Sequence, residues 1–225
     1  GTKKAGHTGT LDPDVEGVLP VCIGRATKIA EYLQDAGKTY EGEATIGVST
    51  TTEDASGDII EKKEIGRPIS REEILAALAS LTGHITQIPP MFSAVKVNGR
   101  RLYEYARAGI EVERPKRDVE IYSLELLDGR ECFEGPVVSF RFRASCSKGT
   151  YIRTLAVMIG EKLGYPAHMS NLTRTEAGGF SKEQCATFQE IEKAVETGIK
   201  ESLLFPLEAG IRHLPKWEIS DTLAE

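Results

Sequence analysis

Residues 4–13 read Lys4-Ala5-Gly6-His7-Thr8-Gly9-Thr10-Leu11-Asp12-Pro13, a glycine-rich stretch that carries one carboxylate, Asp12. Glycines let a backbone bend tightly or approach a ligand closely. Pro13 fixes its own φ angle and disfavours helix at Asp12. A carboxylate held on a stiff loop can act as a nucleophile or a base. The alternative is structural: Asp12 would cap a helix whose first residue is Pro13.

Downstream of this loop, the hydrophobic pattern predicts strands. Apolar and polar residues alternate over 39–48 and over 137–147, which is typical of half-buried strands. Residues 119–127 predict a third strand. Residues 49–58 are rich in Ser, Thr and Asp and predict a loop.

The same pattern predicts four separate helices. One is short, over 26–34, and a second follows a capping box formed by Ser70 and Glu73 and ends before Gly83. A third runs from about 151 to 163 and is closed by a glycine, and a fourth covers 188–197 behind a second capping box. Antiparallel-looking strands with separate helices indicate an α+β protein and not a doubly wound sheet.

Composition sets further bounds. The chain has 225 residues, of which 40% are hydrophobic and 28% charged, and this suits a globular protein with a full core. No run of 18 or more apolar residues occurs, so we expect no membrane span. The four cysteines are scattered without a C-x-x-C pair, which argues against a zinc site or a disulfide framework and suits a cytosolic protein.

The charge is unevenly distributed along the chain. The net charge is −6, yet segment 91–117 carries seven basic and three acidic side chains, and segment 141–153 carries four basic side chains and no acid. Residues 176–225 carry ten acids and five bases. Local field and not total charge steers a polyanion, so the two basic segments could bind nucleic acid; the alternative is that they are solvated faces.

Four blocks of sequence carry a resemblance to a known family. The string GHTGTLDPDVEGVLPVCIGRATK, beginning at Gly6, resembles the signature loop of the tRNA pseudouridine synthase B family. Residues 38–40, 89–96 and 146–153 match three further family blocks, in the same order. The similarity covers about residues 3–207. These enzymes isomerise uridine 55 in the T loop of tRNA to pseudouridine.

The resemblance implies a fold and a domain organisation. It implies the pseudouridine synthase fold, with a mixed, mostly antiparallel central sheet flanked by helices and a thumb-like insertion at about 91–117. Residues 1–210 would be the catalytic domain, and 211–225 the start of a truncated C-terminal RNA-binding domain. The resemblance also leads us to expect that the family's preceding strand, with its K-P-x-G-x-T-S segment, is missing from this sequence, which would expose a sheet edge.

The resemblance also assigns roles to residues in the pocket. The reaction breaks the N1–C1′ bond of a uridine and makes a C5–C1′ bond, after the base has been flipped out of the RNA. Asp12 matches the catalytic aspartate and would attack C1′ or C6, or abstract the 2′ proton. Arg153 would hold Asp12 ionised and oriented. Tyr40 would be catalytic and stack on the uracil, although a tyrosine on that apolar face is by itself more typical of core.

Further residues would bind the RNA. By resemblance, His7, Tyr151 and Leu172 contact the substrate, while an isolated leucine is more often plain core. The basic side chains expected at the RNA backbone are Lys96, Arg100, Arg101 and Lys148. No metal ligand set and no cofactor motif is present, so we expect neither a metal nor a cofactor.

The leading hypothesis is therefore a cofactor-free tRNA isomerase, cytoplasmic and monomeric, with the T stem-loop as substrate and no membrane partner. One alternative is a non-catalytic RNA-binding or tRNA-folding module, for which Asp12 would be irrelevant. Another is a guide-RNA-dependent synthase of the archaeal and eukaryotic kind. The thumb-like segment 91–117 resembles the stand-alone bacterial type and argues against a guide RNA.

Overall fold

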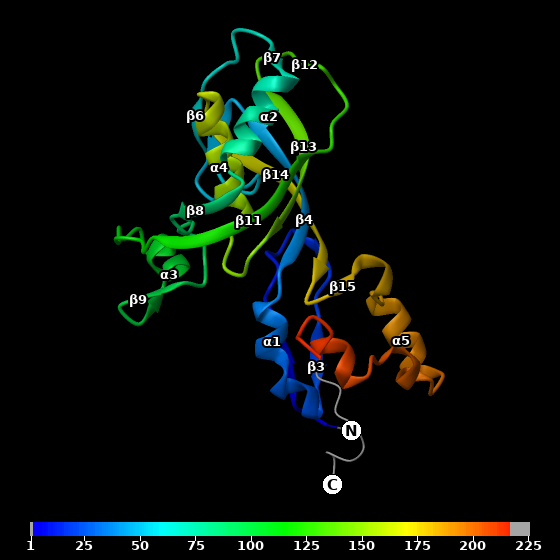
Figure 1. The fold of residues 1–225 in the computed structure, drawn as a ribbon. Coiled ribbons are helices and arrows are strands. Elements are labelled where there is room, and N and C mark those ends of the chain that lie inside the picture. The colour runs from blue at the N-terminus through cyan, green and yellow to red at the C-terminus, as the bar shows by residue number, and fades with distance from the viewer. Residues whose placement is uncertain (1, 217–225) are drawn as a thin grey trace. The chain divides into compact units, whose positions relative to one another are not determined.

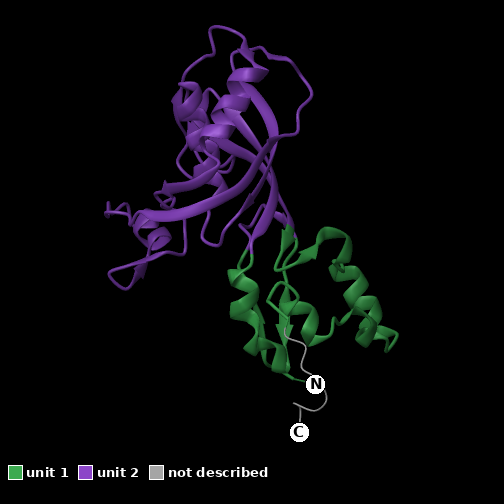
Figure 2. Ribbon diagram, viewed as in Figure 1, with its two compact units in different colours: residues 1–10, 18–36, 176–225 green, residues 11–17, 37–175 purple. Residues whose placement is uncertain are grey.

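The computed structural model describes residues 2–216, which form two compact units (Figure 2). Unit 1 contains the described residues of 1–10, 18–36 and 176–225, and unit 2 contains 11–17 and 37–175. The loop that carries Asp12 therefore belongs to unit 2, and His7 belongs to unit 1. The predicted boundary at residue 210 stays a prediction, and residues 217–225 of the predicted C-terminal segment lie outside the described residues.

Unit 2 is built on a twisted sheet in which long strands lie side by side (Figure 1). The strand order is β14-β4-β13-β11-β8, and β2 pairs with β14. The elements of unit 2 are β2 (Glu16–Gly17), β4 (Lys38–Ile46), β5 (Val48–Thr50), β6 (Ile59–Lys62), β7 (Ile69–Ser70), α2 (Arg71–Ser80), β8 (Gly83–Gln87), β9 (Lys96–Val97), β10 (Arg100–Arg101), α3 (Leu102–Arg107), β11 (Arg117–Leu126), β12 (Cys132–Phe133), β13 (Val138–Cys146), α4 (Ile152–Leu163) and β14 (Ala167–Ala177), whose last two residues fall in unit 1.

The sheet is mixed, as the α+β prediction required. Strands β4, β13, β11 and β8 pair antiparallel in that order, whereas β2 pairs parallel with Thr173 and Arg174 of β14. The parallel pair attaches the short segment after Asp12 to the edge of this sheet. Sheet pairing therefore fixes where the Asp12 loop ends.

Strands β4 and β13 supply the centre of the core, because alternate residues of both point to one face. Phe140 and Phe142 of β13 are fully buried, and Phe142 lies opposite Gly42 of β4. A Cβ on Gly42 would come within 2.8 Å of the Phe142 ring, so only glycine leaves room for this ring. The predicted inward face of residues 39–48 is confirmed up to Ile46.

Helices α2 and α4 pack against each other and cover the buried face of the sheet, α2 on β11 and α4 on β4 (Figure 1). Both were predicted, but α2 ends at Ser80 with Leu81 as its C-cap, and Gly83, the expected stop, begins β8 instead. Ser70 and Glu73 form the capping box of α2, and Gly164 in the left-handed conformation closes α4. The first turn of α4 then places Arg153 at the edge of the core, 5% exposed.

Two boundaries differ from the sequence prediction. The strand expected over 39–48 is interrupted at Gly47 (φ 105°), so that β5 begins at Val48 and pairs with β6 instead. The helix expected over 26–34 is a 3₁₀ turn, η1 (Gly24–Lys28), followed by the short helix α1 (Ala30–Asp35).

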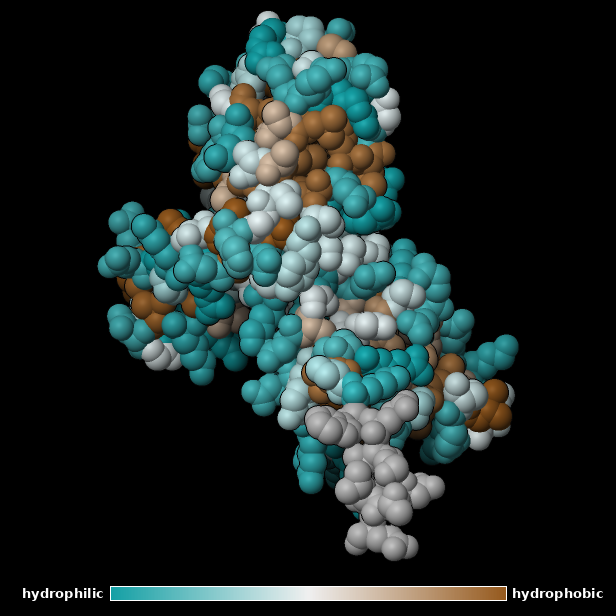
Figure 3. Space-filling view, viewed as in Figure 1, coloured by the Kyte–Doolittle hydropathy of each residue, from teal (hydrophilic) through white to brown (hydrophobic). Residues whose placement is uncertain are grey.

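Unit 1 contains the paired strands β1 (Ala5–His7) and β3 (Val21–Ile23) beside several short helices. In α5, Phe188 and Val195 are 84% and 58% exposed, and brown side chains interrupt the polar surface around this helix (Figure 3). The remaining elements of unit 1 are η1, α1, β15 (Phe180–Ser181), η2 (Lys182–Gln184), α5 (Phe188–Glu196), η3 (Lys200–Leu203) and η4 (Leu207–Ile211). The helix predicted over 188–197 is thus confirmed, with its capping box at Thr187 and Glu190.

Candidate active site

The Asp12 loop is held by a turn and by the sheet edge. The amide of Val15 donates a hydrogen bond to the carbonyl of Asp12 (3.0 Å), and Glu16 and Gly17 then pair with β14. Gly17 has φ +124°, and a Cβ there would overlap the backbone of Arg174. No helix begins at Pro13, so the alternative in which Asp12 is a helix cap is wrong. The proline turn instead leads directly into strand pairing.

Asp12 and Arg153 meet in a two-point ion pair. Nε of Arg153 lies 2.9 Å from Oδ2 of Asp12, and Nη2 donates to Oδ1 at 3.2 Å. The Arg153 side chain is only 6% exposed, whereas that of Asp12 is 42% exposed. The guanidinium is therefore fixed by the protein, while one side of the carboxylate remains open to a ligand. This contact is the one that the sequence prediction required.

The rest of the Arg153 guanidinium is also occupied. Nη1 donates to the carbonyl of Thr52 (3.1 Å) and Nη2 to the carbonyl of Phe92 (3.0 Å). The carboxylate of Asp54 lies 3.7 Å from Nη1. Four of the five N–H donors of Arg153 therefore have hydrogen-bond partners, so the arginine cannot rotate away from Asp12 without losing several charge-assisted hydrogen bonds.

The two aspartates near Arg153 are shifted in opposite directions. Burial raises the pKa of Asp12 above its usual value; Arg153 lowers it in part, and the nearby charge of Asp54 raises it further. Burial also acts to raise the pKa of Asp54, but hydrogen bonds from Ser56 and Thr52, together with Arg153, bring it below its usual value. Asp12 is thus the more basic carboxylate, a property that suits a nucleophile or base.

The charge of Asp12 influences the pKa of Tyr40. It is 9% exposed on β4, and its side chain is hydrogen-bonded to Arg174 of β14, itself 2% exposed. Burial and the charge of Cys146 raise the pKa of Tyr40, Arg174 lowers it in part, and the charge of Asp12 raises it further. The phenol therefore stays protonated. Its ring belongs to the core cluster.

Tyr151 and Leu172 also belong to unit 2, and their predicted contacts with the substrate stay predictions. Tyr151 is the N-cap residue of α4, and its backbone makes two hydrogen bonds with Gln87: its amide donates to Oε1 (2.9 Å), and its carbonyl accepts from Nε2 (3.2 Å). Leu172 is half-buried on β14 and packs against the core. Tyr151 thus precedes the helix that carries Arg153, and Leu172 lies on the strand that carries Arg174.

The predicted RNA-backbone residues are on exposed surfaces. Lys96, Arg100 and Arg101 are exposed on the β9–β10 hairpin, and Lys148 is exposed in the turn before α4. The Arg100 guanidinium lies 4.8 Å from the ring centre of Tyr105, a buried residue of α3. These roles stay predictions.

His7 is not brought to Asp12 by any described contact. It is exposed on β1, its Nδ1 accepts a hydrogen bond from the Gly9 amide (3.2 Å), and its carbonyl accepts from Gln34. Because His7 belongs to unit 1, its role beside the substrate stays a prediction.

Sequence reasoning missed three residues of the site: Glu53, Asp54 and Arg174. The spacing Thr52-x-Asp54-x-Ser56 is typical of an aspartate that caps its own loop, and this signal could have singled out Asp54. Arg174 carried no signal, since a buried arginine on a strand is recognised only from its partners. The 49–58 loop was predicted, but not its contact with Arg153.

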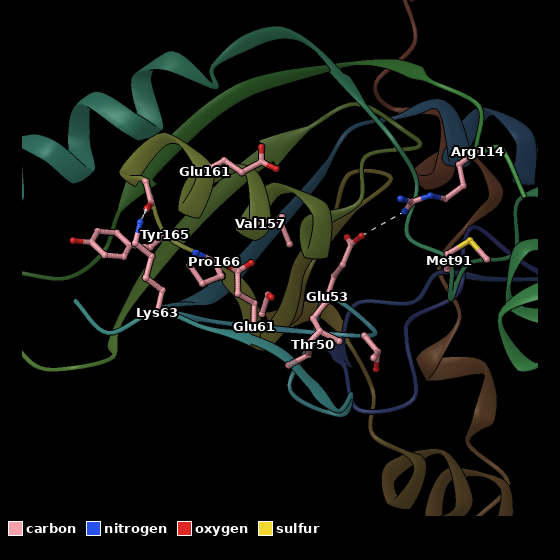
Figure 4. Close-up of a pocket in the computed structure, with 15 residues that line it drawn as sticks. Thr50, Glu53, Glu61, Lys63, Met91, Arg114, Val157, Glu161, Tyr165 and Pro166 are labelled. Atoms are coloured by element: carbon pink, nitrogen blue, oxygen red, sulfur yellow. Dashed lines mark hydrogen bonds and ion pairs between the residues drawn. The ribbon is translucent and has the colours of Figure 1, made fainter. Parts of the chain in front are cut away.

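A pocket of about 580 Å³ in unit 2 has Glu53, Arg114 and Tyr165 among its lining residues (Figure 4). Asp12, Tyr40 and Arg153 do not line it. Within residues 2–216, no group of three or more His, Cys, Asp or Glu side chains is placed to hold a metal ion. In the same residues, no helix is long and apolar enough to span a bilayer.

Two family models match the chain. Residues 1–152 match the model of the TruB family pseudouridylate synthase N-terminal domain, and residues 153–212 match that of the tRNA pseudouridylate synthase B C-terminal domain. The chain belongs to the TruB family of pseudouridylate synthases. Members of this family are isomerases, and the predicted family resemblance is thereby confirmed.

Curated relatives share most of the sequence. A tRNA pseudouridine synthase B from Geobacillus kaustophilus (strain HTA426) is 64% identical over 225 residues, which are 100% of this chain and 79% of that protein. The protein of the same name from Bacillus thuringiensis (strain Al Hakam) is 60% identical over 223 residues, 99% of this chain and 73% of the relative.

Solved structures share the fold. A Cbf5-Nop10-Gar1 complex contains a chain with a TM-score of 0.69 and 33% identity, over 95% of this chain and 54% of that one. An H/ACA RNP bound to a substrate RNA containing 2′-deoxyuridine gives a TM-score of 0.64 and 29% identity, over 95% and 53%. The α+β pseudouridine synthase fold is therefore confirmed, and this chain spans about half the length of those proteins.

Proposed function

We propose that this chain isomerises uridine 55 in the T loop of tRNA to pseudouridine, without a guide RNA. The observation that carries the proposal is the two-point pair between Asp12 and the buried Arg153, in a chain whose curated relatives are named for tRNA pseudouridine synthesis. These relatives are bacterial enzymes that act on tRNA, so we place the reaction in the cytoplasm. We further propose that the active species is a monomer.

The chemistry needs an ionised carboxylate beside a flipped nucleotide. The N1–C1′ bond of the uridine breaks, the uracil turns, and C5 bonds to C1′; C5 then loses its hydrogen to water as a proton, and N1 gains one. Asp12 would serve as nucleophile toward C1′ or C6, or as base at C2′. In each case Arg153 fixes the carboxylate, because its own position is held by Thr52 and Phe92.

The partial burial of Asp12 supports binding of the base beside it. Burial that raises the pKa of Asp12 also strengthens its interactions with a bound uracil and ribose. The Tyr40 ring and the half-buried Leu172 would border the base. The exposed hairpin with Lys96, Arg100 and Arg101 would contact phosphates of the T stem-loop, with Lys148 as a further cation.

The test is tritium release from a T stem-loop that carries [5-³H]uridine, with no guide RNA added. Wild-type protein should release tritium, and Asp12→Asn should release none. The matched control is Asp14→Asn, a neighbouring exposed carboxylate, which should keep wild-type turnover. A stem-loop with cytidine at position 55 and labelled uridine elsewhere should stay unreacted.

Two outcomes would overturn the proposal. Turnover that survives Asp12→Asn would remove Asp12 from the mechanism. Tight binding of the stem-loop by the wild-type protein with no tritium release would favour the non-catalytic RNA-binding or tRNA-folding module. Sedimentation of the protein alone tests the monomer.

A further inference from the structure

Glu53 occupies an unusual position in the loop that holds Arg153. Its φ angle is +64°, a conformation that residues with a Cβ adopt rarely. Its carbonyl accepts a hydrogen bond from the Met169 amide (3.0 Å), and its amide donates to the carbonyl of Thr50 (3.3 Å), so the backbone is pinned on both sides. The carbonyl of Thr52 and the carboxylate of Asp54, on either side of Glu53, both contact the Arg153 guanidinium. The Glu53 side chain has different partners.

The carboxylate of Glu53 joins two elements. Its Oε2 accepts a hydrogen bond from Oγ1 of Thr154 (2.8 Å), and its Oε1 lies 3.8 Å from Nη1 of Arg114. Figure 4 shows the Glu53 side chain reaching toward the Arg114 guanidinium. Thr154 is 8% exposed and directly follows Arg153 in the first turn of α4. A movement of Arg114 would therefore be transmitted to the turn that carries Arg153.

Both ends of segment 91–117 are connected to Arg153. Near the start of the segment, the carbonyl of Phe92 accepts a hydrogen bond from Arg153 itself. Near its end, Arg114 pairs with Glu53, which accepts a hydrogen bond from Thr154, the residue after Arg153. Nη1 of Arg114 also donates to the carbonyl of Pro89 (3.0 Å). This segment carries the exposed basic hairpin, β9–β10, that we expect to contact RNA phosphates.

We propose that Glu53 is a positioning residue for the isomerisation: through Arg114 and Thr154 it couples the position of segment 91–117 to the orientation of Arg153 and hence of Asp12. This inference deepens the proposed function and rests on it. RNA bound to segment 91–117 would thereby influence the orientation of the Asp12 carboxylate, although Asp12 lies outside that segment.

The charge balance at Glu53 supports the coupling. Burial raises the pKa of Glu53 above its usual value, while the Thr154 hydroxyl, Arg114 and Arg153 lower it in part, and Asp54 raises it further. The positive charges of Arg114 and Arg153 favour the ionised form of Glu53. Displacement of Arg114 would remove one of these two cations from a half-buried carboxylate.

The experiment is a double-mutant cycle on the full chain. Glu53→Gln, Arg114→Gln and the double variant are compared by single-turnover tritium release at saturating T stem-loop, and by filter binding for the stem-loop Kd. We expect Glu53→Gln to slow the single-turnover step about tenfold, because a small misplacement of a catalytic group has effects of this order. Its Kd should change less than about threefold, and the double variant should be no slower than the slower single variant.

Controls separate positioning from folding. Glu161→Gln removes an exposed carboxylate that lines the same pocket and should keep the wild-type rate constant. Arg114→Lys should restore most of the rate lost in Arg114→Gln, since it keeps the cation. Melting temperatures of all variants are measured in parallel, so that if Glu53→Gln fails to fold, the Arg114 pair of variants still gives the comparison.

The proposal is overturned if the effects of Glu53→Gln and Arg114→Gln on the rate constant multiply in the double variant, or if Glu53→Gln matches Glu161→Gln at wild-type speed. It is also overturned if Arg114→Lys is as slow as Arg114→Gln. A wild-type protein that releases no tritium would instead contradict the proposed function.

Discussion

Arg153 holds Asp12 side-on, with Nε 2.9 Å from Oδ2 and Nη2 3.2 Å from Oδ1. The two residues are 141 positions apart in the chain. Such a fork needs the planar guanidinium of arginine, because a lysine ammonium is a single point of charge on a flexible stem. The geometry therefore ties the orientation of the carboxylate to one particular residue type.

Arg153→Lys should separate charge from geometry. We expect the single-turnover rate of tritium release at neutral pH to fall by on the order of 10²-fold, because the carboxylate loses its fixed orientation. Arg153 lowers the pKa of Asp12, so weakening this contact should move the acidic limb of the pH–rate profile to higher pH. The measurement is single-turnover rate against pH. Arg141→Lys, at an exposed sheet position, is the control, and a profile for Arg153→Lys that superimposes on the wild type would contradict the prediction.

Asp54→Asn should move the acidic limb of the pH–rate profile to lower pH, opposite to the shift expected for Arg153→Lys. The charge of Asp54 raises the pKa of Asp12, so its removal should let Asp12 ionise at lower pH. The rate at neutral pH should still fall, since the Asp54 carboxylate lies 3.7 Å from the Arg153 guanidinium and helps to hold it. Opposite shifts of the acidic limb in Asp54→Asn and Arg153→Lys would be hard to obtain from a general loosening of the fold. A shift in the same direction in both variants would refute this assignment.

Gly17→Ala should damage both stability and activity. Gly17 has φ +124°, and a Cβ there would overlap the backbone of Arg174, the residue that binds Tyr40. We expect the free energy of unfolding in urea to fall by about 1–3 kcal/mol, the usual range for forced backbone strain, with loss of most tritium release. Gly129→Ala is the control, because a Cβ at Gly129 meets nothing within 4 Å. Equal stability of the two variants would show that β2 does not need this glycine.

Glu73→Gln should make the protein less sensitive to acid. Hydrogen bonds from Arg67 and from the Ser70 amide lower the pKa of Glu73 to about 2, from an ordinary value of 4.5. A lowered native pKa stabilises the fold fully above the ordinary value, and this contribution is lost as the pH falls through about 2. Urea unfolding should therefore show wild type more stable than Glu73→Gln at pH 7, with a smaller difference at pH 3. Glu72→Gln, in the same helical turn, is the control, and a difference that does not narrow at pH 3 would contradict the prediction.

Local features of the fold were predictable because they depend on residues a few positions apart. The capping boxes at Ser70 and Thr187 and the glycine that closes α4 follow from hydrogen bonds within one helical turn. The buried face of β13 follows from the two-residue period of a strand. The alternating pattern of residues 39–48 continues past Gly47, but the strand itself ends there because the residues from Val48 onward pair with β6.

The sequence alone determined the family, through four motif blocks in order, and with it the identity of Asp12, Tyr40 and Arg153 as candidates. Only the tertiary structure decided that Asp12 does not cap a helix and that Arg174 is hydrogen-bonded to Tyr40. It also decided that Glu53 connects Arg114 to the turn carrying Arg153. The reason is physical: a motif fixes which groups are present and how the backbone bends locally. The partners of a buried charge come from strands and loops that are distant in sequence, and these meet only when the sheet has formed.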